Sequence, residues 1–566
     1  MGKLGTVHGS ARWVLLLGLT GCGQSHPDFG SAADQDVDKT SAALVTGREF
    51  TILPQTDGST RQTIFQWEAA SDAGDVNGDG FDDVIVSAYW FRGWYSSRAY
   101  VVFGKPGSAA VELDDIEAGI GGFPLNGESQ AFLYAQLTVS AAGDVNGDGL
   151  DDLLVGDPVD YNYFRGKGYV VFGKEDSAAV ELSDVSAGIG GFSITGEGTW
   201  DATGRYLANA GDVNGDGLDD VLLASPYATG DTPYSCRSYV VFGKKTTASV
   251  DLIEVAAGLG GYTIDCDDAD TGALSASILD ASGAGDVNGD GLDDVIVATA
   301  SGTFGRSYVV FGKAGTASVS LSSVRAGSGG IAILGEAAGD YAGFSVGGGG
   351  DVNADGLSDI VIGAPGKSTT ATFSGRAYVV FGTSSTANIS LSDVAVGSGG
   401  FIVDGAAASD SAGVVVDVLR DVNADGLDDV AVACDRHLGD PAAAATHVVF
   451  GKTSTAPVSL ATIPAGAEGL TRIEPRAPFD EEHGMGTSPA GDVDADGFDD
   501  FVLGPPLSEN GYVVFGADFS GLVTLRGTKV ADTLAATDPS APDVLVGDLG
   551  WDTLSSDGGG DILLAG

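Results

Sequence analysis

Seven short acidic segments hold the residues of this sequence that are best suited to chemistry. Each follows the pattern D-x-[ND]-x-D-G-x-x-D, and the third copy lies in Gly211–Asp220, which reads GDVNGDGLDD. Side-chain oxygens occupy positions 1, 3, 5 and 9, and position 7 offers its backbone carbonyl. Glycine at position 6 permits a tight turn that folds these oxygens round one point. The pattern therefore predicts a loop that binds a hard cation.

The ligand types favour Ca²⁺. A set made only of oxygens, without His or Cys, selects calcium over zinc or copper, and the number of oxygens disfavours Mg²⁺. An EF-hand does not fit, because position 12 is apolar (Val86 in the first copy) where that loop needs Glu, and because strands are expected on both sides. We expect about seven calcium ions, with the tightest in the seventh loop, where position 3 is also an aspartate.

The predicted ligands at positions 1, 3, 5, 7 and 9 are, loop by loop, Asp75, Asn77, Asp79, Phe81, Asp83; Asp144, Asn146, Asp148, Leu150, Asp152; Asp212, Asn214, Asp216, Leu218, Asp220; Asp286, Asn288, Asp290, Leu292, Asp294; Asp351, Asn353, Asp355, Leu357, Asp359; Asp421, Asn423, Asp425, Leu427, Asp429; and Asp492, Asp494, Asp496, Phe498, Asp500. Position 8 is Asp82 in the first loop but Ser358 in the fifth, so it is not expected to be a required ligand.

The even spacing of the loops indicates structural repeats. Consecutive first aspartates are 65 to 74 residues apart, and each interval also holds a segment like Phe50–Leu53 and a strand like the YVVFG that begins at Tyr100. With one strand before and one after each loop, every repeat has four strands. The prediction is an all-β, seven-bladed β-propeller with four-stranded antiparallel blades. Since no copy of the Phe50 segment follows the last YVVFG, the N-terminal strand should complete the last blade.

At this point the chain resembles the FG-GAP repeats of the integrin α-subunit propeller. The resemblance rests on the acidic loops, on Gly363-Ala364-Pro365 after the fifth loop and on lead-ins such as Ala342–Val346, and it covers about residues 49–516. It implies that the loops bind Ca²⁺ on one face of the ring, between the first and second strands of each blade, and that ligands bind the other face or the rim. Because all seven loops are kept, we expect a bacterial relative and not a true integrin subunit.

The two ends of the chain differ from the repeats. Residues 1–21 resemble a bacterial lipoprotein signal peptide, with Leu19, Thr20 and Gly21 before Cys22 as the lipidated residue; an ordinary signal peptide with an incidental cysteine is the alternative. Residues 22–48 read as a flexible tether. Residues 517–566 resemble a short, degenerate form of the haemolysin-type nonapeptide calcium repeat, which would add further calcium; the alternative is a plain acidic tail. These features predict export and lipid anchoring to the outer membrane or cell surface.

The cysteines suggest one crosslink. Cys236 precedes a third strand and Cys266 ends the fourth strand of the same blade, so antiparallel pairing would bring them together as a disulfide. Cys434 is expected to be a buried thiol.

The composition and motifs favour a binding protein. A net charge of −52 would repel nucleic acid. We see no nucleophile elbow, P-loop or zinc-protease motif, so we expect no enzyme. The favoured interpretation is a monomeric adhesion or recognition propeller for protein or glycan ligands, bound through the aromatic-rich connections Ala88–Ser97 and Asp157–Lys167; the alternative for these aromatic residues is that they pack over a blade edge. A secreted enzyme or toxin-like factor with the propeller as accessory scaffold is the alternative, and a purely structural envelope protein is a third.

Overall fold

We analysed a computed structural model of the chain. The structure describes residues 49–53, 65–90, 96–128, 137–158, 165–199, 201–225, 236–266, 278–299, 305–369, 371–436, 443–461, 463, 469–475, 486–504 and 511–517, together with five short strands between 523 and 564. The chain divides into two compact units, Met1–Thr40 and Ser41–Gly566. The first unit lies outside the described residues, and with it the predicted signal peptide and Cys22.

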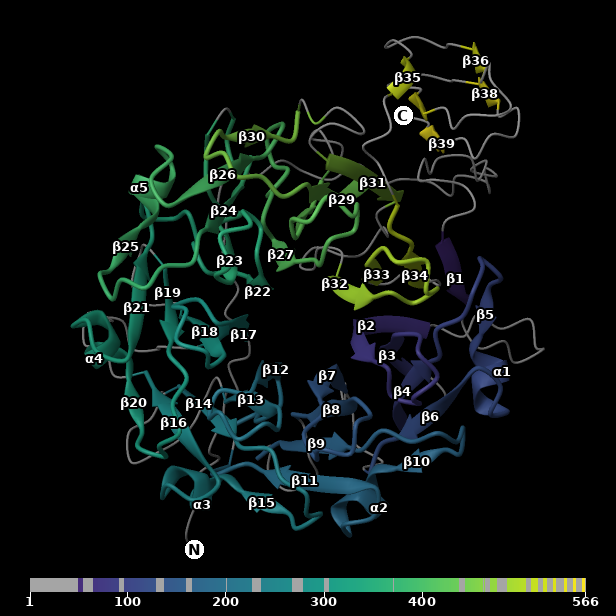
Figure 1. Ribbon diagram of the computed structural model, residues 1–566, viewed down its shortest axis with the longest axis vertical. Coiled ribbons are helices and arrows are strands. Elements are labelled where there is room, and N and C mark those ends of the chain that lie inside the picture. The colour runs from purple at the N-terminus through teal and green to yellow at the C-terminus, as the bar shows by residue number, and fades with distance from the viewer. Residues whose placement is uncertain are drawn as a thin grey trace, which may run out of the picture. The chain divides into compact units, whose positions relative to one another are not determined.

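Seven small sheets stand around a common axis as the blades of a propeller (Figure 1). Within each blade the four predicted strands are antiparallel, and in the first six blades they follow the chain from the axis to the rim. The first strands, around the axis, are β2 (Phe65–Gly74), β7 (Thr138–Gly143), β12 (Tyr206–Gly211), β17 (Ile278–Gly285), β22 (Val346–Gly350), β27 (Val415–Val418) and β32 (Gly486–Gly491). The second strands are β3 (Asp83–Trp90), β8 (Asp152–Asp157), β13 (Asp220–Ser225), β18 (Asp294–Thr299), β23 (Asp359–Gly363), β28 (Val430–Cys434) and β33 (Asp500–Gly504).

The outer strands complete the blades. The third strands are β4 (Ser96–Val102), β9 (Lys167–Val171), β14 (Arg237–Val241), β19 (Arg306–Val310), β24 (Arg376–Val380), β29 (Ala443–Val449) and β34 (Gly511–Val514). The fourth strands are β6 (Gly122–Asn126), β11 (Gly191–Thr195), β16 (Gly261–Asp265), β21 (Gly330–Leu334), β26 (Gly400–Asp404), β31 (Gly469–Pro475) and β1 (Glu49–Leu53).

The sequence of the middle strands explains why they lie between blades. In β23 every residue from Asp359 to Gly363 is buried, and in β24 every residue from Arg376 to Val380 is buried as well. A strand with both faces covered reads as a continuous β-branched or aromatic run instead of an alternating one. Apolar residues on both faces therefore join neighbouring blades into one ring.

The ring closes with strands from both ends of the repeat region, as the unmatched N-terminal segment predicts. β1 pairs antiparallel with β34, with Glu49 opposite Val514 and Ile52 opposite Gly511. The last blade thus receives its fourth strand from the start of the propeller, and the ring has no open seam at that edge.

The strand count per blade is larger than predicted. In six sheets a two-residue fifth strand pairs parallel with the fourth, and it comes from the third-to-fourth connection of the following blade. A short helix follows each of the first five of these strands. The fifth strands are β5 (Val111–Glu112), β10 (Val180–Glu181), β15 (Val250–Asp251), β20 (Val319–Ser320), β25 (Ile389–Ser390) and β30 (Val458–Ser459), and the helices are α1 (Leu113–Glu117), α2 (Leu182–Ser186), α3 (Leu252–Ala256), α4 (Leu321–Arg325) and α5 (Leu391–Val394).

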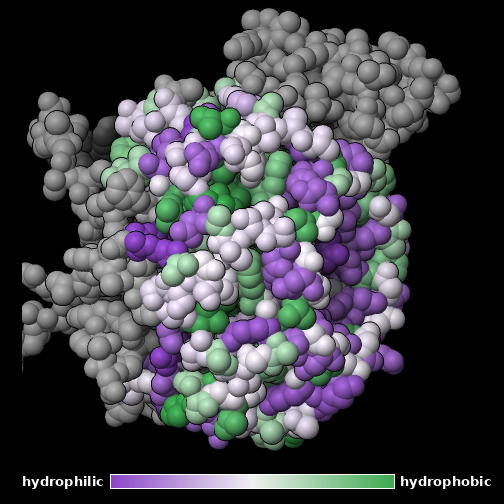
Figure 2. Space-filling view, turned by 60° about the vertical axis from the view of Figure 1, so that its left-hand side comes forward, coloured by the Kyte–Doolittle hydropathy of each residue, from purple (hydrophilic) through white to green (hydrophobic). Residues whose placement is uncertain are grey.

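The helices lie at the outside of the ring (Figure 1). On the side that carries α4 and α5, hydrophilic and hydrophobic residues are interspersed (Figure 2). No helix among the described residues is long and apolar enough to cross a membrane.

The C-terminal segment forms short parallel strands. β35 (Val523–Arg526), β37 (Val544–Val546) and β39 (Ile562–Leu564) make one sheet, and β36 (Thr533–Ala535) and β38 (Thr553–Ser555) make another. Alternate strands thus belong to alternate sheets. The aspartates of the nonapeptide repeat predicted for this segment lie outside the described residues, so that repeat stays a prediction.

Candidate metal centre

Each acidic loop connects the first and second strands of its blade, so all seven lie at the same end of the propeller. In the third loop the position-1 carboxylate organises the turn. Its Oδ1 accepts the N–H of Gly215 (2.7 Å) and of Asp216 (3.0 Å), and its Oδ2 accepts the N–H of Gly217 (2.8 Å). Gly217, at position 6, has φ +85°, a conformation that favours glycine. Asp212 therefore sits at the centre of the loop.

The position-9 aspartate is the buried member of the set. Asp220 has no exposed surface, and its carboxylate accepts the N–H of Gly243 at 2.8 Å. Burial raises its pKa to about 7, and the carboxylates of Asp216 and Asp212 add to the shift. The position-9 pKa is raised by burial in all seven loops, to about 8 in Asp83, Asp152, Asp359 and Asp500. Each loop thus holds a buried position-9 carboxylate, and no basic side chain of the seven loops neutralises its charge.

The position-3 asparagines have a defined orientation. In six loops their Nδ2 donates to the position-9 carboxylate, for example from Asn214 to Asp220 at 3.0 Å. The amide oxygen is then turned away from that aspartate. In the sixth loop the Oδ1 of Asn423 is buried and has no hydrogen-bond partner. A buried acceptor without a partner is unfavourable unless a ligand satisfies it.

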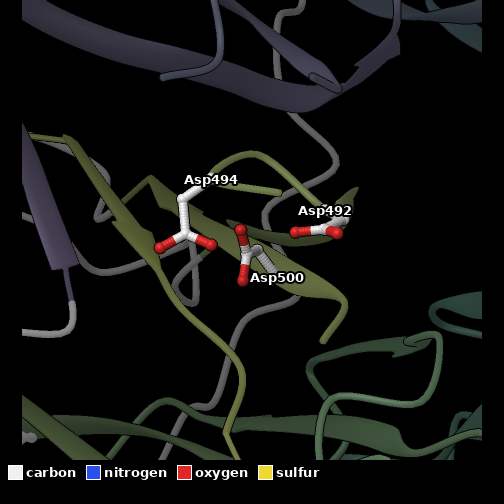
Figure 3. Close-up of side chains that lie close together, drawn as sticks. All are labelled: Asp492, Asp494 and Asp500. Atoms are coloured by element: carbon white, nitrogen blue, oxygen red, sulfur yellow. The ribbon is translucent and has the colours of Figure 1, made fainter. Parts of the chain in front are cut away.

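The seventh loop gathers three carboxylates. Asp492, Asp494 and Asp500, at positions 1, 3 and 9, offer oxygens that all lie within 4.8 Å of one another. Figure 3 shows the three side chains turned toward a common point. Among the described residues this is the one group of three or more acidic, His or Cys side chains that converges so closely. Like charges at this separation require a cation or protons between them.

Position 5 also contributes to the turn of the loop, and the position-7 side chain contributes to the contact between blades. Asp496 lies outside the converging group, and its Oδ1 accepts the N–H of Phe498 at 3.1 Å. The equivalent bond joins Asp216 and Leu218 in the third loop. Position 5 therefore shapes the turn. The position-7 side chain lies against the preceding blade, where Leu218 would touch a Cβ added to Gly147.

Position 8, which the sequence did not predict to be a required ligand, links neighbouring blades. The Oδ2 of Asp293 accepts the N–H of Asp212, the position-1 aspartate of the preceding loop, at 2.9 Å. In return the N–H of Asp293 donates to the carbonyl of Asp212. The backbone half of this exchange occurs at all seven junctions, and the carboxylate half at five, where the acceptors are Asp82, Asp151, Asp219, Asp293 and Asp428.

One loop departs from the others at the residue before position 1. Six loops have glycine there. At five of them a position-8 carboxylate of the next blade fills the space that a side chain would need, and at Gly285 the Ser358 hydroxyl does so; a Cβ on Gly211, for example, would lie 2.2 Å from Asp293 Oδ2. The sixth loop has Arg420 instead. At this junction the position-8 residue of the next blade is Asp499, and its carboxylate does not accept the N–H of Asp421. Burial raises the pKa of Asp499 to about 6, and the positive charge of Arg420 opposes that rise.

The donor set suits a hard divalent cation. Each loop offers a carboxylate at position 1, an amide or carboxylate oxygen at position 3 and a buried carboxylate at position 9, and the third of these is electrostatically unfavourable without a positive charge. The unpartnered Asn423 oxygen and the converging acids of the seventh loop are independent signs of this fit.

The cysteines have the arrangement predicted from the order of the strands. Cys236 and Cys266 form a disulfide with their Cα atoms 5.4 Å apart, at the ends of β14 and β16. Cys434, at the end of β28, is a buried free thiol.

Comparison with known proteins agrees with the fold. Residues 69–102, 206–241 and 342–380 match the FG-GAP repeat. Integrin alpha pat-2 of Caenorhabditis briggsae is 29% identical over 243 residues, which are 40% of this chain and 17% of the relative. Integrin alpha-4 of Xenopus laevis is 37% identical over 87 residues, 15% of this chain and 8% of the relative. The chain thus carries FG-GAP repeats in a seven-bladed propeller and has integrin α homologues.

A second group of relatives bears the name of an enzyme. Phosphatidylinositol-glycan-specific phospholipase D of Mus musculus is 32% identical over 167 residues, 28% of this chain and 18% of the relative. These matches span less than a fifth of the relatives' length, as do those to the integrins, and they do not establish an activity for this chain.

Proposed function

We propose that this chain is a calcium-stabilised propeller, held at the cell surface by a lipid on Cys22, that binds protein or glycan ligands in adhesion or recognition. The observation that carries the calcium part is the buried position-9 carboxylate, present in every loop beside a second and third oxygen donor. The likeness to integrin α propellers supports the adhesive role.

The loops would stabilise the ring by linking neighbouring blades. Asp212 and Asp220 hold the two ends of one loop together, and Asp293 of the next blade bonds the backbone of Asp212. Calcium, when bound, supplies the positive charge that the buried carboxylates lack. Each filled loop then stabilises its own turn and, through position 8, the junction with its neighbour.

The ligand surface is expected at the opposite end of the strands from the metal loops. The aromatic residues predicted for it in the first two blades lie outside the residues whose side chains are described. In the fifth blade, Phe373 lies in the equivalent connection, between β23 and β24, and is 38% exposed. Tyr341 and Phe344 lie at the same end of the blade, in the connection between β21 and β22, and are 42% and 40% exposed. Tyr341 and Phe373 also have positive φ, 56° and 53°, which is unfavourable for a bulky residue. Exposed rings held in this way suit recognition of a partner.

A binding screen tests the proposal. Protein and glycan arrays should be probed with purified chain in calcium and again after chelation, and any positive should be repeated with the double variant Tyr341→Ala and Phe373→Ala. The proposal expects calcium-dependent binding to at least one class of ligand. Binding that needs neither calcium nor an ordered propeller would contradict it.

The similarity to phospholipase D relatives favours one alternative, that the chain is an enzyme. It predicts turnover of a phosphatidylinositol-glycan or polymer substrate by the purified chain. A rate above background that survives inactivation of contaminants would favour it over pure binding.

A further inference from the structure

The propeller has an axial channel with an acidic lining. Its volume is about 730 Å³, and residues from the region of all seven first strands line it. Three lining carboxylates come from the strands, those of Asp72, Asp280 and Asp417, and three more belong to position-8 aspartates at the loop end. Arg420 is the single basic residue among the lining residues.

Two of the strand acids have no cationic partner. Arg420 acts electrostatically on Asp72, but no basic group acts on Asp280 or Asp417 within the part of the chain that the structure describes. Asp280 accepts the N–H of Ala281 and of Val346, both at 2.9 Å, and Asp417 accepts its neighbour Val418 N–H at 3.0 Å. Burial raises the pKa of Asp280 to about 6 and that of Asp417 to about 8.

The strand between these acids lets them approach the axis. β22 is VGGGG, and a Cβ on Gly347 would lie 2.5 Å from Asp417 Oδ1. On the other side of β22, Asp280 of the fourth blade accepts a hydrogen bond from the N–H of Val346, the residue before Gly347. The glycine-rich strand β22 thus lies between Asp280 and Asp417. These two acids are close enough for the charge of Asp280 to raise the pKa of Asp417.

A separate observation also indicates a missing ligand. Thr487, on β32, lines the same channel and is only 7% exposed, yet its Oγ1 has no hydrogen-bond partner. A threonine hydroxyl offers acceptor lone pairs to an N–H donor. A buried hydroxyl without a partner is unfavourable unless something else in the channel satisfies it.

The spread of the acids decides the shape of the ligand. Asp280, Asp417 and Asp72 lie six, four and three residues before the first aspartate of their loops, so they differ in height along the axis by up to about 10 Å. They do not converge as Asp492, Asp494 and Asp500 do. Dispersed charges suit several cationic groups on one chain better than a single chelated ion. Apolar lining residues such as Val139 and Leu207 suit the methylenes between those groups.

We propose that the axial channel is a binding site for a linear polyamine, a flexible chain of ammonium groups separated by methylenes. Asp280 and Asp417 bind its charged groups, and Thr487 accepts a hydrogen bond from one of them. This inference does not depend on the calcium loops or on the ligand of the opposite face.

The test is calorimetric titration of the full chain with spermine, in saturating calcium and at physiological ionic strength so that the loops do not compete. We expect one saturable site. The variant Asp280→Asn with Asp417→Asn should weaken it at least about tenfold. The control Asp184→Asn with Glu254→Gln makes the same change of charge at exposed positions on α2 and α3, and it should bind like the unmodified chain.

A third variant keeps the test decisive if the amide variant does not fold. Ser282→Lys puts a resident ammonium on β17, two residues from Asp280 and therefore on the same face of the strand, so it should abolish binding by filling the site. Equal spermine affinity of the Asp280→Asn, Asp417→Asn variant and of the Asp184→Asn, Glu254→Gln control would show that spermine is attracted only to the acidic surface. That result would overturn the proposal. Absence of a saturable site in the unmodified chain would do the same.

Discussion

Asp82 and Asp492, separated by 410 residues in sequence, exchange two hydrogen bonds across the closure of the ring: the N–H of Asp492 donates to Asp82 Oδ2 at 2.8 Å, and the N–H of Asp82 donates to the carbonyl of Asp492 at 3.3 Å. The same exchange joins the first and third loops to their successors. The junction where the chain ends meet is therefore built like an internal junction.

Removal of the Asp82 carboxylate should weaken this closure. Asp82→Ala leaves the N–H of Asp492 without its acceptor, so we expect the free energy of unfolding to fall by roughly 1–3 kcal/mol in saturating calcium. Urea denaturation measures this free energy of unfolding. Asp499→Ala is the matched control, because that position-8 carboxylate does not accept the corresponding N–H, and its effect should stay within about 0.5 kcal/mol. Equal losses in the two variants would show that the carboxylate link is unimportant.

The glycine before each loop should not tolerate a side chain. Gly211 has φ +67°, and its added Cβ would meet the Asp293 carboxylate, so Gly211→Ala should cost roughly 1–3 kcal/mol. A Cβ on Gly315 meets nothing within 4 Å, and Gly315→Ala should be neutral or slightly stabilising. Thermal melts of the two variants give the comparison. A neutral Gly211→Ala would mean that the position-8 carboxylate does not occupy this space.

The Cys236–Cys266 disulfide should stabilise the third blade. The two cysteines are 30 residues apart, so the loss of chain entropy predicts roughly 3–4 kcal/mol. The melting temperature should fall on reduction. Cys236→Ala with Cys266→Ala should have the lower value from the start and be insensitive to reductant; a variant still sensitive to it would point to a different crosslink.

Metal-free protein should lose stability as the pH rises. The folded pKa of Asp83, Asp152, Asp220, Asp294, Asp359 and Asp500 is raised to about 7 or 8, above the ordinary 3.8. The folded state therefore binds more protons than the unfolded state between about pH 4 and pH 8, and this contribution, complete below pH 4, is lost as the pH passes through 7 to 8.

Melting curves in chelator from pH 5 to about pH 8.5 measure this slope, and calcium should flatten it because the ion replaces the proton. The apparent calcium affinity should rise over the same range. A metal-free melting temperature that rises with pH would contradict the proposed burial of these acids.

The sequence was sufficient to predict the ring because each loop marks a blade, and the unmatched segment at Phe50 predicted the pairing of β1 with β34. The fifth strands and short helices were missed, since two-residue strands carry almost no periodic signal. A repeated apolar pair three residues apart, such as Leu182 and Val185, both buried, was the available sign of a helical turn.

The role of position 8 was also missed, for a different reason. Asp82 and Asp492 become neighbours only when the ring closes, and Asp293 contacts a loop about 80 residues earlier. Within one loop the same aspartate looks dispensable, because Ser358 replaces it in the fifth. Contacts between repeats are therefore less visible in the sequence than ligands within one repeat.

Calcium content and thermal stability measured on the same samples test the central claim most directly. We expect about seven ions per propeller, more if the tail also binds, and a fall in melting temperature on the order of 10 °C or more in excess EDTA. Asp500→Asn should lose one ion, whereas Asp499→Asn, one residue away at position 8, should keep all of them. A melting temperature unchanged by EDTA, with no stoichiometric calcium, would contradict the account.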